Sequence, residues 1–181
     1  MGAAGLGVTT LRAIRIWLVI FIVCLVLSGI TAFPLQAELR LVAGVLHALP
    51  NVIPPLTAWI DRVRDALIAT DGRYPFLSYG TDWLAFAHLV IAVAFIGPLR
   101  DPVRNVWIIV WGMIACVGII PLAVIAGAVR GIPWGWTLID CSFGVIGIIP
   151  LLIVYRLIRR LEGEQEAAAG SESTTHPARS T

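Results

Sequence analysis

Long apolar runs, separated by arginine-bearing segments, constrain this chain more than any other feature of its sequence. Such runs occupy residues 16–33, 82–97, 106–129 and 137–155. A helix that crosses the hydrocarbon core of a bilayer needs about 20 mostly apolar residues, and these runs approach or reach that length. Because a backbone in lipid must satisfy its own hydrogen bonds, each run is expected to be an α-helix. The pattern predicts an all-α polytopic membrane protein with four transmembrane helices in a bundle.

The composition agrees with burial in lipid rather than in one soluble core. Hydrophobic residues make up 59% of the chain and charged residues 13%, with a mean hydropathy of +0.90. A soluble domain has roughly 45–50% apolar and about 25% charged residues. The formal net charge is only +2 and every basic side chain is arginine, so no lysine-rich patch suggests nucleic acid. We expect the lipid bilayer as a partner, and no nucleic acid.

The first apolar run has two interpretations. Arg12 and Arg15 precede residues 16–33, and a positive segment before an apolar stretch is also the layout of a cleavable secretory signal. At about 18 residues the run is longer than the apolar core of a typical signal, which favours an uncleaved membrane helix. Cleavage would leave the later spans unchanged.

Residues 35–80 are mixed in character and are expected to form a cap of two amphipathic helices, which lie on the bilayer or cover the bundle. On the polar side of the second helix, Asp61 is spaced for pairing with Arg64, and Arg62 with Asp65. Two stripes of apolar residues recur at helical spacing. The stripes are Leu39, Val42, Leu46 and Leu49, and then Leu56, Trp59, Ile60, Val63 and Leu67.

The placement of arginine sets the expected orientation. Arginines flank the spans at residues 12–15, 100–104 and 156–160, whereas the connection between the third and fourth runs holds only Arg130. Basic residues next to membrane spans favour the cytoplasm. Both termini are therefore expected in the cytoplasm, and the cap at residues 35–80 on the other side.

The expected domain organisation has three parts. Residues 1–15 form a cytoplasmic N-terminus, and residues 16–160 form the four-helix membrane domain that includes the cap. Residues 161–181 are rich in Glu, Ala, Ser and Thr and have no apolar period. Such composition is typical of disorder, so this last part is expected to be a disordered cytoplasmic tail.

Two ionisable residues, His88 and Asp140, lie inside the predicted spans. Because such residues are costly in hydrocarbon, they are candidates for a functional site. At about 1.5 Å per residue, both lie roughly 6–9 Å below the same outer surface. Arg130, at the end of the third run, is long enough to reach toward Asp140. The sequence thus predicts an intramembrane polar site of His88, Asp140 and Arg130.

Small residues share the helical faces of these two side chains, and small residues mark the face where membrane helices approach closely. Both side chains are therefore expected to point into the bundle. The stripe of His88 contains Thr81, Ala85 and Ala92, and that of Asp140 contains Thr137, Gly144 and Gly147.

Three interpretations of this polar cluster remain open. It is a structural knot in which Asp140 accepts from Arg130 or His88, or a site for proton transfer or for gripping a lipid, quinone or small head group, or a pair that never meets. A close approach of His88 and Asp140 beside an open cavity favours the second interpretation. A packed and fully paired knot favours the first.

No metal ligand set, nucleophile motif or phosphate-binding loop is recognisable, so the catalytic residues are unknown and no cofactor is expected. Bis-histidine b-type haem is an alternative, because a four-helix membrane bundle can hold it. It would need His47 to fold inward beside His88, since His176 lies in the tail. The three cysteines fall inside apolar runs and do not suggest a disulfide framework. They are Cys24, Cys116 and Cys141.

Three segments carry a resemblance. They read GTDWLAFAH at residues 80–88, GPLRDPVRN at 97–105 and IDCSFG at 139–144. With these segments the chain, over roughly residues 11–160, resembles a group of small uncharacterised bacterial four-span inner-membrane proteins. The resemblance implies a bacterial inner membrane and a four-span body, and it implies no activity.

The expected role is an accessory or structural component of the inner membrane, with a membrane-protein partner or a second copy of the chain. The alternative is a membrane-embedded enzyme or proton-coupled small-molecule carrier that uses His88 and Asp140. The sequence leaves open whether the protein is an enzyme.

Overall fold

The described part of the chain is helical apart from short connections. The computed structural model describes residues 3–49 and 54–175, with side chains described over residues 7–49 and 54–167. These ranges contain no strand, which confirms the predicted all-α class. The elements are α1 (Ala3–Ala32), α2 (Leu35–Ala48), α3 (Pro54–Arg73), the 3₁₀ turn η1 (Pro75–Leu77), α4 (Tyr79–Ala94), α5 (Ile96–Arg100), α6 (Val106–Arg130) and α7 (Trp134–Thr175).

Four helical segments are long and apolar enough to cross a membrane, as the runs predict. Large apolar side chains stay exposed along them, for example Ile125 at 65% and Val129 at 81%. Apolar exposure of this extent is typical of a surface solvated by lipid. The protein is therefore a multi-pass membrane protein. The segments are Gly7–Ala32, Pro75–Arg100, Val106–Arg130 and Trp134–Ala167.

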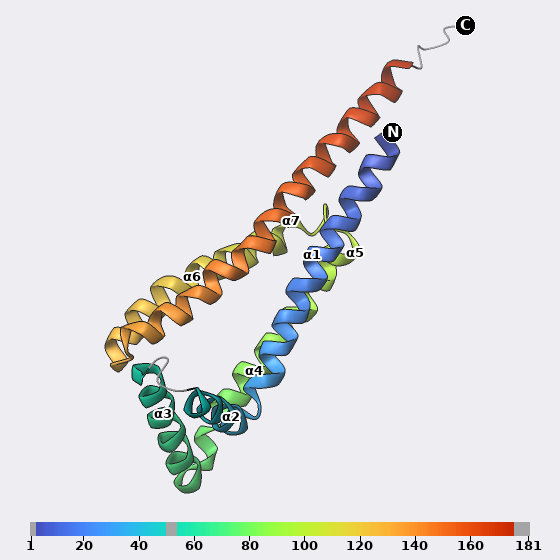
Figure 1. Cartoon of the computed structure of the whole chain (residues 1–181). Coiled ribbons are helices and arrows are strands. Elements are labelled where there is room, and N and C mark those ends of the chain that lie inside the picture. Colours follow the sequence, from blue (N-terminus) through green and yellow to red (C-terminus); the bar gives the residue numbers. More distant parts are fainter. Residues whose placement is uncertain (1–2, 50–53, 176–181) are drawn as a thin grey trace, which may run out of the picture.

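The long helices form two pairs rather than an evenly packed bundle. α1 packs against α4, α6 packs against α7, and α1 also packs against α7. Figure 1 shows the pairs meeting toward the end that carries both termini and diverging toward the opposite end, where α2 and α3 lie. We call these two ends the terminal end and the cap end, and we call α2 with α3 the cap.

The main core lies where the pairs meet. Ile14 and Leu18 of α1 and Leu151 and Val154 of α7 are fully buried there, together with Phe95 after α4. Lipid tails are as apolar as these side chains, so close van der Waals packing holds this core rather than the exclusion of water. The two pairs are thus joined at the terminal end.

The second span begins before residue 82, as the shortness of the run at residues 82–97 allows, but it does not end at Pro98. The helical segment begins at Pro75, and Pro98 lies inside α5 instead of closing the span. Proline has no N–H group, so Pro98 leaves the Ala94 carbonyl without its helical partner. The break at Phe95 follows from this loss, and Pro98 itself is tolerated in the first turn of α5.

The tail also differs from its expected structure. α7 continues without interruption to Thr175, so residues 161–175 are helical rather than irregular. Arg159 pairs with Glu162 at 2.9 Å and Arg160 with Glu164 at 3.1 Å, at the i,i+3 and i,i+4 spacings that stabilise a helix. Glu, Gln and Ala favour helix strongly, which explains the extension. Residues 176–181 lie outside the described part.

The two helices of the cap pack against each other through a second, smaller core. Ile60 and Leu39 are buried there, as the stripes predict. The stripe predicted for α2 is shifted, however, because Ala43 is buried while Val42 and Leu49 are exposed. The small side chain of Ala43 lets the two helix backbones approach, which the larger valine would prevent.

Candidate functional site

Arg130 and Asp140 lie close together at the cap end of the α6–α7 pair. Both line a cavity of about 270 Å³ whose other walls are mainly apolar side chains of α6. Asp140 is half-buried and Arg130 is exposed. Among the described residues, neither side chain forms a hydrogen bond or an ion pair. The two residues are therefore close together, as predicted, but they do not form the paired knot.

A tight turn between α6 and α7 positions the two residues. Gly131 adopts the left-handed conformation at φ 66°, and the Ile132 N–H donates to the Gly127 carbonyl at 2.9 Å. This arrangement ends a helix and lets the chain reverse, and Pro133 then prevents α6 from continuing. A Cβ on Gly127 would lie 3.0 Å from Thr137 Oγ1. The two helix ends consequently meet at the turn.

His88 lies on the other helix pair. Its Nδ1 donates to the Leu84 carbonyl of the same helix at 2.8 Å, which leaves Nε2 as the acceptor of the neutral ring. Its Cβ lies 3.1 Å from the position that a Cβ on Gly29 of α1 would occupy. The small-residue face of α4 thus packs against α1, and His88 points toward that helix.

The three residues predicted as one site are therefore divided. Figure 1 shows the cap-end halves of α4 and α7 on different arms of the structure, and the described residues contain no bond between His88 and Asp140. A fully paired knot would have favoured a structural role, and an approach of His88 to Asp140 would have favoured a functional site. The described residues show neither geometry. Arg130 and Asp140 remain together beside a cavity.

The cap carries a polar network that the sequence only partly indicates. Asp61 binds Arg64 at 2.9 Å, as predicted, but Asp65 binds Arg64 at 2.8 Å instead of Arg62. His47 Nε2 lies 2.9 Å from Asp61 Oδ2 and so links α2 to α3. The hydrogen bond from Arg64 to Asp65 raises the pKa of Arg64, and the charges of Asp65 and Asp61 act in the same direction.

His47 therefore does not turn inward beside His88, as the haem alternative would need. Its Nε2 is bonded to Asp61 in the cap, and His176 lies outside the described residues. The described part of the chain also contains no group of three side chains that could hold a metal ion.

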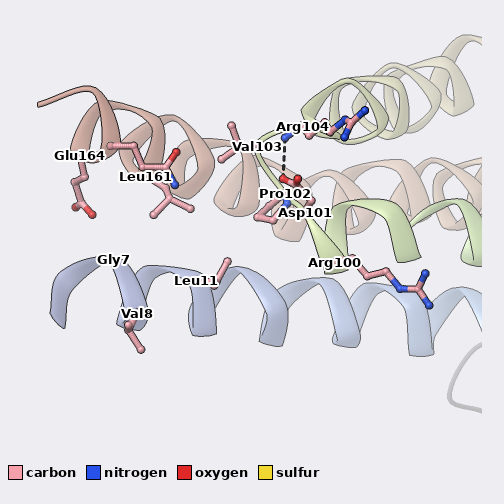
Figure 2. A pocket seen from close by; sticks show the side chains of 11 residues that line it. Gly7, Val8, Leu11, Arg100, Asp101, Pro102, Val103, Arg104, Leu161 and Glu164 are labelled. Carbon is pink, nitrogen blue, oxygen red and sulfur yellow. Dashed lines mark hydrogen bonds between the residues drawn. The ribbon is translucent and has the colours of Figure 1, made fainter. Parts of the chain in front are cut away.

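A larger cavity, of about 860 Å³, lies at the terminal end between α1, α7 and the α5–α6 connection. Figure 2 shows its lining, in which the side chains of Arg100 and Arg104 extend away from Glu164. The Asp101 carboxylate accepts from the Arg104 backbone N–H at 3.1 Å and holds the connection. The guanidinium groups thus flank this cavity instead of crossing it.

A third cavity, of about 380 Å³, lies at the cap end where α1, α2, α3 and α4 come together. We call it the junction cavity. Its charged wall residues are Arg40, Asp71 and Asp82. They come from three segments far apart in the sequence, so no local pattern indicated this grouping.

No protein-family model, curated protein or solved structure matches this chain. The function is therefore argued from geometry alone, and the resemblance to small bacterial membrane proteins stays an expectation.

Proposed function

We propose that the protein is an accessory or structural component of a bacterial inner membrane, with both termini in the cytoplasm and the cap on the opposite side. In this proposal the cap holds two transmembrane helix pairs apart. The outer apolar faces of the pairs then contact a membrane-protein partner or a second copy of the chain.

The observation that carries this proposal is that the cap contacts both helix pairs. Trp136, at the start of α7, packs against the hydrophobic core of the cap. On the other pair, α2 follows α1 after a short turn, and the Ser78 hydroxyl at the start of α4 donates to Asp71 of α3 at 2.8 Å. Because the cap contacts both helix pairs, we infer that it fixes the distance between them at the cap end.

The outer face of α6 supports a role in contact with other membrane components. Four of its large apolar side chains are at least 65% exposed, and they recur along most of the helix. In a bilayer, lipid and a neighbouring helix both suit such a face. The side chains are Ile114, Leu122, Ile125 and Val129.

A second candidate function rests on Arg130 and Asp140. Their shared cavity and the lack of an ion pair between them favour a site that grips a small polar group. An enzyme or carrier of this kind would work without the predicted contribution of His88.

The experiment that separates these two functions is site-specific photo-crosslinking in native membranes. A photoreactive residue in place of Ile114 or Ile125, neither of which lines the cavity of Arg130 and Asp140, is expected to give one discrete protein adduct, the same for both positions. The same residue at Arg62, exposed on the cap, is the control for non-specific capture. Two results together would favour the second function. The photoreactive residues would crosslink to lipid alone, and an Asp140→Asn variant that inserts normally would fail to rescue the phenotype of a gene deletion.

A further inference from the structure

We propose that the junction cavity binds the head group of a zwitterionic phospholipid that carries a primary ammonium group, with the phosphate at Arg40 and the ammonium between Asp71 and Asp82. This site is separate from the proposed accessory function. Neither Arg130 nor Asp140 contributes to it.

The charges of the cavity suit a ligand with both signs. Arg40, Asp71 and Asp82 all line the cavity, yet Arg40 forms no ion pair with either carboxylate in the described part of the chain. Among the described residues, only one oxygen of Asp71 accepts a hydrogen bond, from the Ser78 hydroxyl at 2.8 Å. A phosphate and an ammonium on one ligand would satisfy both sides through charge-assisted hydrogen bonds.

The carboxylates select a primary ammonium over other cationic groups. A primary ammonium has three N–H donors, and the cavity offers two carboxylates and the Thr81 hydroxyl oxygen as acceptors. A trimethylammonium group has no N–H donor, so it would leave these acceptors unpaired. An anionic head group without a cation would place its charge beside two carboxylates, which is unfavourable.

The position of the cavity indicates a lipid rather than a soluble zwitterion. Phe33 and Pro34 of its wall directly follow the first span, and Asp82 lies in the first turn of α4. Beside Asp82, Tyr79 and Trp83 are 62% and 58% exposed, which is typical of aromatic side chains at head-group depth. A volume of about 380 Å³ also lies in the range of small-ligand pockets.

The test offers the purified, delipidated full-length protein an equal mixture of phosphatidylethanolamine, phosphatidylcholine and phosphatidylglycerol, with bound lipid counted by native mass spectrometry. Phosphatidylethanolamine is expected in several-fold excess. Arg40→Gln and Asp82→Asn should each lower its retention by about fivefold or more, as the loss of a charged hydrogen bond predicts. Arg40→Lys should keep most of it. Arg62→Gln, which removes an exposed arginine of the cap, is the matched control.

Arg40 and Asp82 are exposed, so these substitutions remove no core packing, and circular dichroism checks the helices. Equal retention of the three lipids, or preference for phosphatidylglycerol, would overturn the proposal. So would equal retention in wild type and in both charge-removing variants. Binding of free phosphoethanolamine without any lipid preference would assign the same chemistry to a soluble ligand and would refute the lipid source.

Discussion

Gly144 of α7 lies directly against the backbone carbonyl of Cys116 in α6, so closely that no Cβ atom fits between them. At Gly112, which precedes Cys116 in α6, an added Cβ would meet the side chains of Phe95 and Leu151 at 2.8 and 3.0 Å. Small residues therefore set how closely this helix pair packs, as in other membrane helix pairs.

Gly144→Ala is expected to destabilise the protein by about 1–3 kcal/mol, because the added methyl group must push α6 away from α7. Unfolding in mixed detergent measures the change. Gly118→Ala on α6 is the matched control, since no atom lies within 4 Å of its added Cβ. Alanine there should be neutral or stabilise by up to about 1 kcal/mol. Equal effects of the two variants would contradict the close contact.

Asp61→Asn is expected to loosen the cap. The substitution keeps the size of the side chain but removes the charge that both His47 and Arg64 contact. Amide hydrogen exchange in α2 should rise by up to about fivefold, since partly exposed ion pairs contribute little. Arg62→Gln serves as the control. If exchange in α2 were unchanged, the His47–Asp61 contact would not hold the cap together.

Much of the fold could be predicted from local pattern. The four apolar runs gave the spans, and the apolar period of α3 gave its buried face at Ile60. The end of α6 followed from Gly131 and Pro133. The divergence of the helix pairs could not be predicted, because small residues such as Gly29 and Gly144 mark a close approach without identifying the partner helix.

The same ambiguity explains the candidate site. The small-residue stripes of His88 and Asp140 both lie against another helix, but the two stripes belong to different helix pairs. The stripe of His88 meets α1 at Gly29, and the stripe of Asp140 continues into Gly144, which meets α6. Arg130 is adjacent to Asp140 because one short turn joins their helices, and that part followed from the sequence.

His88→Ala and Asp140→Asn are expected to act independently. Because the two side chains are not in contact, the double variant should change the free energy of unfolding by the sum of the single changes, within about 0.5 kcal/mol. Thermal unfolding in detergent provides the three values. A coupling clearly above that limit would place the two residues in one network.

The orientation is testable in intact cells with a membrane-impermeant thiol reagent. A cysteine in place of Ala69, exposed in the cap, should be modified at once. A cysteine in place of Glu166, exposed near the end of α7, should react only after permeabilisation. The unsubstituted protein provides the background from its own cysteines, which lie within the spans. The reverse labelling pattern would invert the proposed topology.

The central claim is that the two helix pairs are held apart at the cap end. Spin-label distances in lipid nanodiscs test it most directly, with labels at Leu84 of α4, Leu138 of α7 and Ile30 of α1, which are all exposed near that end. The distance from Leu84 to Leu138 should be clearly longer than that from Leu84 to Ile30, with a narrow distribution that broadens in Trp136→Ala. Two equally short distances would indicate a closed bundle and contradict the account.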